Sequence, residues 1–149
     1  MTERTVTAKR VPPAQLAPQL RDAITRLNRR VRQARPVGDL TLTQVSALTS
    51  LRLAGAMTPR ELADVERVQP PTMTKIVGKL EDRGLVRRTP HPTDGRQVIL
   101  EATEGGEAVL DQFERARDEW LAHRLAALDE DERETLQRAA EILQQVARA

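Results

Sequence analysis

Two short groups of side chains in this sequence have the chemistry for contacting a polyanion. The first mixes prolines, threonines and lysines, and comprises Pro70, Pro71, Thr72, Thr74, Lys75 and Lys79. Lysine can donate to guanine, and threonine offers a hydroxyl and a methyl group to base edges. The second comprises Arg88, Asp94 and Arg96, in and beside a polar turn. Arginine is attracted to the negative potential of a narrow A·T minor groove. Both groups predict contacts with duplex DNA.

The first group lies on a predicted helix that spans about residues 70–83 and is stopped by Gly84. At 100° per residue, its apolar side chains occupy one third of the circumference and should face inward. The opposite face includes Lys75 and Asp82. Because phosphate would repel Asp82, we expect residues 70–75 to enter the major groove most deeply, where the helix dipole also favours an anion. Lys79 is then expected to contact the backbone.

A glycine in the middle of this helix, Gly78, has two interpretations. Glycine there costs roughly 1 kcal/mol relative to alanine, which calls for a reason. Either the helix approaches DNA closely at this point, or the glycine allows close packing within the protein. An amphipathic helix with several cations is by itself usually a solvated surface helix. Its position behind a capped short helix and before a hairpin favours the DNA interpretation.

The second group lies in a predicted hairpin with strands at about residues 86–89 and 97–101. Arg96, near the turn, is expected in the minor groove, with Asp94 holding its guanidinium by a charge-assisted hydrogen bond. The alternative is that Asp94 and Arg96 only stabilise the turn. Arg87 and Arg88 point to opposite faces of their strand, so only one is expected to contact phosphate, and Arg88 is the candidate.

The order of predicted elements favours a mainly α fold with a small β-hairpin wing (α+β), a winged helix-turn-helix. The predicted helix boundaries rest on capping residues and breakers. The first helix is expected from Pro13 to Ala34, and the second from a capping box of Thr41 and Gln44 to Gly55. Later helices are expected to begin at Thr58-Pro59-Arg60-Glu61, at Thr103, and at Asp129 with Glu132.

Three regions follow from this order. Residues 1–12 are expected to be a flexible basic arm, residues 37–103 the DNA-binding lobe, and residues 13–36 and 104–149 a helical dimerisation region. The outer helices carry apolar stripes that need a partner, and a two-fold symmetric dimer suits palindromic DNA. Residues 1–35 hold nine Arg/Lys against two Asp/Glu, whereas residues 101–149 hold six against thirteen. These opposite charges either attract each other or are ordinary solvated helix faces.

Composition excludes several classes of protein. The chain has 149 residues, two histidines and no cysteine, so disulfides, thiolate metal ligands and thiol redox switches are excluded. No apolar run is long enough to span a membrane, and the first residues lack a secretory signal, so we expect a cytoplasmic location. Without a catalytic triad or a glycine-rich phosphate loop, we expect neither an enzyme nor a cofactor. His91 and His123 alone make a zinc site improbable, and the acidic run 129–132 is interpreted as a helix start.

From about residue 14 to 147 the chain resembles the MarR family of bacterial winged-helix regulators. The matching segments are LTLTQVSAL (40–48), MTPRELAD (57–64), MTKIVGKLEDRGLVRR (73–88) and HPTDGRQVILEAT (91–103). The wing signature of the family is typically Asp-Pro-x-Asp-x-Arg. Pro92, Asp94 and Arg96 match it, whereas His91 stands where the family usually has Asp.

This resemblance implies an obligate homodimer that represses nearby genes from a palindromic operator and releases it when a small molecule binds or a cysteine is oxidised. The oxidation route is closed here because the chain has no cysteine. Family ligands are often phenolic or aromatic carboxylates. Arg52, His123 and Arg124 are candidates to meet a carboxylate, although exposed arginine is the commoner explanation, so no ligand-binding residue is assigned.

Two other functions stay open. One is a nucleoid-type protein that binds DNA with little sequence preference, which a specificity ratio would reveal. The other is a protein–protein adaptor that kept the winged fold but lost DNA binding. The presence of Thr74, Lys75, Arg88 and Arg96 argues against the adaptor.

Overall fold

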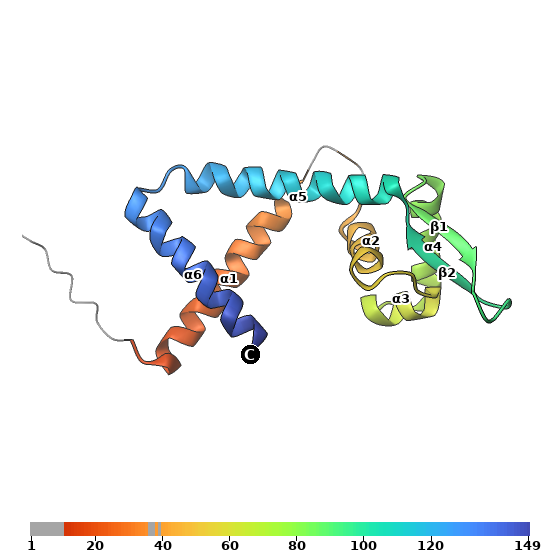
Figure 1. The fold of residues 1–149 in the computed structure, drawn as a ribbon, viewed down its shortest axis with the longest axis horizontal. Helices are drawn as coiled ribbons and strands as arrows, with labels where there is room; N and C mark the ends of the chain where they lie inside the picture. The colour runs from red at the N-terminus through yellow and green to blue at the C-terminus, as the bar shows by residue number, and fades with distance from the viewer. Residues whose placement is uncertain (1–10, 36–37, 39) are drawn as a thin grey trace, which may run out of the picture. The chain divides into compact units, whose positions relative to one another are not determined.

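The computed structural model describes residues 11–35, 38 and 40–149 (Figure 1). Two compact units divide the chain, residues 1–34 and residues 35–149. The first ten residues of the predicted basic arm lie outside the described residues. The elements in chain order are α1 (Pro13–Gln33), α2 (Leu42–Ala54), α3 (Pro59–Glu66), α4 (Pro70–Asp82), β1 (Val86–Pro90), β2 (Val98–Ala102), α5 (Glu104–Leu125) and α6 (Glu130–Arg148). This order confirms the predicted winged helix-turn-helix.

The starts of α2, α3 and α6 are fixed by capping boxes, as their sequences predict. Thr41, Thr58 and Asp129 each accept a hydrogen bond from the backbone N–H three residues later. The side chains at those third positions, Gln44, Glu61 and Glu132, accept from the N-cap backbone in return. A cap of this kind typically stabilises a helix by about 1 kcal/mol. These three boxes therefore set where each helix begins.

The turn between α3 and α4 uses a left-handed residue that is not glycine. Arg67 has φ 54° and ψ 42°, and its N–H donates to the carbonyl of Asp64. The next N–H, of Val68, donates back to Ala63. This turn orients α4 relative to α3. Gly84 is also left-handed, at φ 69°, and it lets the chain leave α4 and enter β1.

The wing is an antiparallel pair of five-residue strands. Val86 lies opposite Ala102, and the register continues to Pro90 opposite Val98. Leu100 forms a further bridge with Met57, just before α3, through N–O distances of 2.8 and 3.2 Å. Strand β1 ends one residue later than the sequence predicts, because pairing continues to Pro90. Strand β2 begins and ends one residue later, because its pairing runs from Val98 to Ala102. The bridge attaches the base of the wing to the helix-turn-helix.

One core lies among α2, α3, α4, the hairpin and the first half of α5. Its largest fully buried side chains are Leu48, Leu62, Met73, Leu80, Leu100 and Val77. In contrast, neither α1 nor α6 has a buried residue. Within the part of the chain that the structure describes, no helix has the length and hydropathy needed to cross a bilayer.

Candidate nucleic-acid interface

Helix α4 divides cleanly into a buried face and an exposed face. Met73, Val77 and Leu80 are at most 1% exposed and anchor the helix in the core. All six predicted contact residues of α4 are exposed, namely Pro70, Pro71, Thr72, Thr74, Lys75 and Lys79. Among the residues that the structure describes, none pairs with the ammonium groups of Lys75 and Lys79. The inward face thus fixes the helix, and the outward face is open to a ligand.

The start of α4 differs from an ordinary anion-binding helix N-terminus. Pro70 and Pro71 have no N–H, and the N–H groups of Thr72 and Met73 both donate to the carbonyl of Gln69, at 2.9 and 3.1 Å. The expectation that this terminus favours an anion is therefore only half right. The dipole field remains, but the N–H groups that usually hold a phosphate are missing or already bonded. An anion at this terminus would therefore have to be held by side chains.

Thr74 has its hydroxyl hydrogen in use. The hydroxyl donates to the carbonyl of Pro70, one turn earlier, at 3.0 Å. What Thr74 can present to a base edge is its methyl group and the lone pairs of its oxygen. The thymine methyl group and base amino groups suit these atoms, whereas a base acceptor does not.

Gly78 has open space where a side chain would be. No heavy atom lies within 4 Å of the position that a Cβ would occupy. Close packing within the described chain therefore does not explain this glycine. The remaining interpretation is an approach by something outside the chain.

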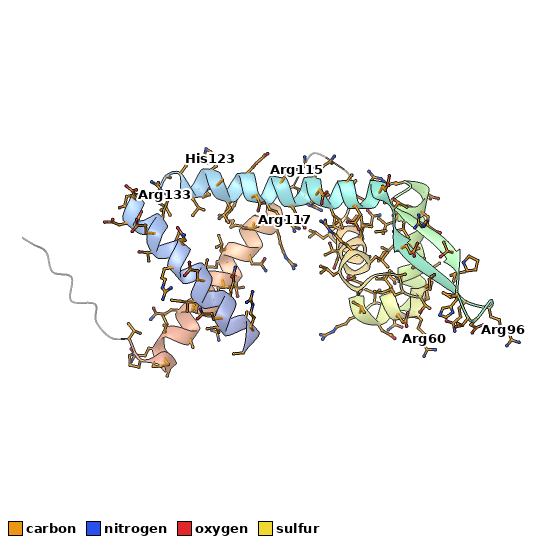
Figure 2. All side chains as sticks on the ribbon, in the orientation of Figure 1. Arg60, Arg96, Arg115, Arg117, His123 and Arg133 are labelled. Carbon is orange, nitrogen blue, oxygen red and sulfur yellow. The ribbon has the colours of Figure 1, made fainter. Side chains whose placement is uncertain are left out.

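At the tip of the wing, Arg96 is exposed, and the described part of the chain holds no partner for its guanidinium (Figure 2). Asp94 does not hold that guanidinium, contrary to expectation. Its Oδ1 accepts instead from the backbone N–H of Arg96, at 3.1 Å. Two residues apart in a tight turn, the backbone N–H is closer and already oriented, which is the geometry of an Asx turn. Asp94 shapes the turn, and Arg96 extends from it.

Arg88 is already engaged by a carboxylate of the same chain. Its Nε and Nη2 donate to the two carboxylate oxygens of Glu81, each at 2.9 Å. These hydrogen bonds raise the pKa of Arg88; burial opposes them and the charge of Glu81 adds to them. The pair joins the end of α4 to β1. Arg87 likewise pairs with Glu101, directly across the hairpin, at 2.8 Å. A phosphate contact by Arg88 would have to share or displace Glu81.

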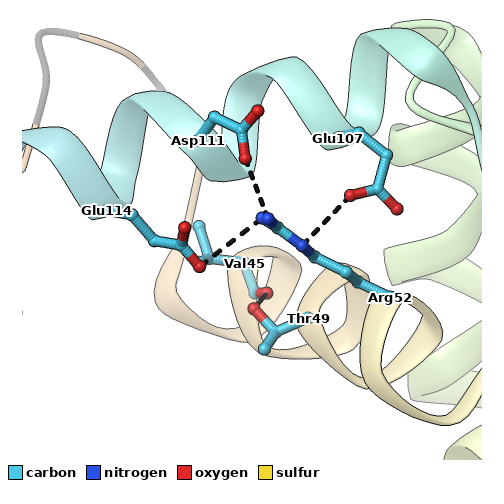
Figure 3. Close-up of polar contacts among 6 residues, drawn as sticks. All are labelled: Val45, Thr49, Arg52, Glu107, Asp111 and Glu114. Atoms are coloured by element: carbon cyan, nitrogen blue, oxygen red, sulfur yellow. Dashed lines mark hydrogen bonds and ion pairs between the residues drawn. The ribbon is translucent and has the colours of Figure 1, made fainter.

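A third arginine, Arg52 of α2, is held by three carboxylates of α5 (Figure 3). Its nitrogens lie 3.1 Å from Glu107, 2.9 Å from Asp111 and 3.5 Å from Glu114. The three carboxylates share one face of α5 because they are four and three residues apart. Arg52, considered above as a contact for a ligand carboxylate, is thus occupied, and it fastens α2 to α5.

The other two candidates for a ligand carboxylate differ from Arg52. The guanidinium of Arg124 lies over the ring of Trp120, 5.3 Å from its centroid. His123 is exposed on the last turn of α5 (Figure 2). Over the described residues, no group of three His, Cys, Asp or Glu side chains is placed to hold a metal ion.

Sequence reasoning missed two features of this surface. Arg60, in the first turn of α3, is exposed, and Figure 2 shows its side chain directed outward. A cation directly after a Thr-Pro helix start was the available signal. The pairing of Glu81 with Arg88 was also missed. Opposite charges on either side of the Gly84 stop were the signal for it.

Comparisons with known proteins agree with this geometry. Residues 40–98 match the model of the MarR family. An uncharacterized HTH-type transcriptional regulator of Mycobacterium bovis is 48% identical over 130 residues, which cover 87% of this chain and 91% of the relative. A solved structure of a mutant MarR from Escherichia coli has 28% identity and a TM-score of 0.63, over 91% of this chain and 98% of that one.

A second solved structure, a mutant of MepR from S. aureus bound to an oligodeoxyribonucleotide, has a TM-score of 0.67 over 88% of this chain and 97% of that one. At 20% identity it shows a common fold alone. The Mycobacterium relative, in contrast, is similar over nearly its whole length, and MarR itself is among the curated relatives, at 38% identity over 74 residues. With the winged fold and the exposed face of α4, these findings show that the chain belongs to the MarR family of DNA-binding transcriptional regulators, which are not enzymes.

Proposed function

We propose that this regulator is a homodimeric repressor that binds a palindromic operator near its own gene. The observation that carries the proposal is the exposed face of α4. The helix is anchored by four buried side chains, and the side chains of Thr72, Lys75 and Lys79 have no partner in the described chain. Each subunit would insert residues 70–75 into the major groove of one half-site. Arg96 of the wing would enter the adjacent minor groove.

The dimer rests on the apolar stripes of the outer helices. Both α1 and α6 lack buried residues, yet each carries large apolar side chains that are 36–66% exposed, namely Leu16, Leu20, Ile24 and Leu27, and Leu136, Ile142 and Val146. Exposed apolar surface of this extent favours a partner. A second copy of the chain is the natural one, because two identical recognition helices suit the two halves of a palindrome.

We also propose that a small aromatic or anionic ligand releases the protein from its operator. This part of the proposal is supported only by membership of the MarR family. The candidate Arg52 is occupied by three carboxylates, so an anionic ligand there would compete with them. The second candidate function is a nucleoid-type protein of low specificity. It is favoured by the engaged hydroxyl of Thr74, since the remaining free groups on α4 are mainly cations.

Selection of binding sites from a random duplex library separates these functions. The affinity for the selected duplex is compared with that for competitor DNA at one stated salt concentration. A repressor yields an inverted repeat and a specificity ratio on the order of 10³ or more. A ratio near one, or no enriched repeat, would replace the proposal with the nucleoid-type function.

Three variants test the contacts. Lys75→Ala should lower affinity by about 1–3 kcal/mol and relax base preference at one position, whereas loss that is uniform over all sequences would make Lys75 a phosphate contact. Arg96→Ala should weaken binding with the dimer unchanged. Arg87→Ala is the matched control, because Arg87 is paired with Glu101, and its effect should be smaller. Equal affinities for the Arg96 variant and the parent would remove the wing from the proposal.

The dimer has its own test. Ile142→Glu places a charge on the apolar stripe of α6 and should shift sedimentation toward the monomer at micromolar concentration. The lobe should keep its fold, because Ile142 is outside its core. A parent chain that sediments as a monomer at all concentrations would contradict the proposal.

A further inference from the structure

A histidine organises the turn at the tip of the wing. His91 directly follows β1, and its Nδ1 accepts hydrogen bonds from the backbone N–H groups of Thr93, at 3.2 Å, and Asp94, at 3.1 Å. The Thr93 hydroxyl lies 3.4 Å from the same nitrogen. The backbone N–H of His91 donates to the carbonyl of Gln97 across the turn. One ring nitrogen thus accepts hydrogen bonds from the backbone N–H groups of Thr93 and Asp94, which begin the turn that leads to Arg96.

This arrangement needs an imidazole without a proton on Nδ1. A neutral imidazole has one acceptor nitrogen and one N–H, whereas an imidazolium has two N–H groups and no acceptor. Protonation of Nδ1 would set its hydrogen against those of Thr93 and Asp94. An aspartate, the residue usual at this position, accepts such bonds at any pH where it is ionised. With His91 the hydrogen bonds exist only while Nδ1 carries no hydrogen.

Of the charged groups near this ring, Glu61 at the start of α3 interacts with it electrostatically, whereas the carboxylate of Asp94 accepts from the backbone N–H of Arg96. The pKa of Glu61 is lowered by hydrogen bonds from the backbone N–H of Thr58 and from its hydroxyl; burial opposes this, and the positive charge of His91 adds a smaller lowering. An imidazolium at position 91 is therefore attracted to α3. Protonation would remove the hydrogen bonds to the turn and leave an imidazolium that is attracted to the carboxylate of Glu61.

We propose that neutral His91 is a positioning residue for DNA binding, one that holds the wing turn so that Arg96 points into the minor groove, and that protonation of His91 releases the turn and weakens binding. The proposal rests on the proposed function, in which the wing contacts DNA. His91 itself touches no base in this scheme. It acts through the backbone of Thr93 and Asp94.

The first experiment needs no DNA. In a His123→Gln background His91 is the single histidine, so its ring nitrogens can be assigned by NMR. At pH 8 the neutral ring should carry its hydrogen on Nε2. On acidification the backbone amide signals of Thr93 and Asp94 should shift with the same midpoint as the ring. A hydrogen on Nδ1 at pH 8, or amide signals that do not follow the ring, would overturn the proposal.

The second experiment measures binding of a fluorescent duplex carrying the selected inverted repeat, at pH 8 and pH 5.5. Loss of two neutral hydrogen bonds at the turn should weaken binding by the parent about three- to tenfold at pH 5.5. His91→Asn supplies a neutral acceptor at both pH values and should bind equally at both. His91→Ala lacks the acceptor and should bind weakly at both. His123→Gln should behave as the parent does.

The outcomes are separable. Equal binding by the parent at pH 5.5 would show that protonation of His91 does not affect affinity, and tighter binding would show that the added positive charge outweighs the loss of the turn. Either result would overturn the proposal. An Asn variant with the pH dependence of the parent would do the same. If selection enriches no duplex, the proposed function fails and the DNA-binding role of His91 fails with it, while the NMR experiment still shows whether His91 organises the turn.

Discussion

Residues 40–103, the continuous described part of the predicted lobe, and helix α6 use similar apolar residues with opposite results. Leu48, Leu62, Leu80 and Leu100 of the lobe are all 0% exposed, whereas Leu136 and Ile142 of α6 are 45% and 46% exposed. The lobe buries these four leucines within one chain. Helix α6 has the amphipathic pattern but no cover in the described chain. The comparison indicates that the lobe is stabilised by contacts within the chain, whereas α6 needs contacts from outside the described chain.

This division suits a DNA-binding protein. Side chains that read bases need a rigid support, because small displacements weaken directional hydrogen bonds. The lobe provides it through a core shared by α2, α3, α4, the hairpin and the first half of α5. In the proposed dimer, the outer helices would set the distance between the two lobes, which would have to match the spacing of the half-sites.

The largest expected effect is that of removing a core leucine. Leu48→Ala should lower the free energy of unfolding by about 2–5 kcal/mol at any protein concentration. Leu136→Ala is the matched variant on α6, and its destabilisation should grow as the protein is diluted, because a dimer contact depends on concentration. Urea denaturation at several concentrations measures both. A Leu136 variant whose loss is independent of concentration would break the comparison.

The next largest effects are expected at two helical glycines, Gly106 in the core and Gly78 on the exposed face of α4. In Gly106→Ala the new Cβ meets the backbone carbonyl of Leu85, closer than any real contact, so about 1–3 kcal/mol should be lost. Gly78→Ala adds a methyl group in open space and should stabilise α4 by up to about 1 kcal/mol. If α4 lies against DNA at Gly78, the same variant should bind the selected duplex more weakly. Thermal unfolding and duplex titration measure the two effects, and unchanged DNA affinity would leave Gly78 without an explanation.

Arg52 supports the lobe from α5, with a smaller expected effect. Arg52→Gln should cost about 1 kcal/mol, because the Arg52 side chain is 28% exposed and its three partners are 43–60% exposed, where water and salt screen the charges. The loss should shrink in 1 M NaCl. Arg138→Gln, which removes the exposed pair with Glu141, is the control and should change stability little. Equal effects of the two variants would deny Arg52 a special role.

The smallest expected effect concerns the capping box of α3. The pKa of Glu61 in the folded chain is lowered from 4.5 by hydrogen bonds from the backbone N–H and hydroxyl of Thr58. Its contribution to stability is therefore fully present above pH 4.5 and is lost as pH falls through the lowered value. Glu61→Gln should flatten the decline of unfolding free energy in that acidic range. A parent and variant with identical pH profiles would contradict this.

Much of the fold was predictable because its boundaries are local. Capping boxes at Thr41, Thr58 and Asp129, and the breakers Gly55 and Gly84, act within four residues of themselves. The buried stripe of α4 followed from periodicity alone. The predicted boundaries were therefore wrong by only about one residue.

The pairings of charges were not predictable, because they join residues that only the fold brings together. Arg52 is 59 residues from Asp111, and Arg88 reaches Glu81 across the turn at Gly84. The expected contact of Asp94 with the guanidinium of Arg96 was wrong for a different reason, since a backbone N–H competed for the same oxygen. That residues 70–79 and Arg96 contact DNA stays a prediction.

The strand register of the wing sets how far its tip extends from the lobe. Each strand residue advances about 3.3 Å. Two extra residues in both strands would keep every side chain on its face and carry Arg96 about 7 Å farther out. One extra residue in β1 alone would invert the faces beyond it, and an insertion before Arg88 would turn its guanidinium away from Glu81. The unbroken pairing from Val86 to Pro90 therefore determines how far from α4 the wing reaches.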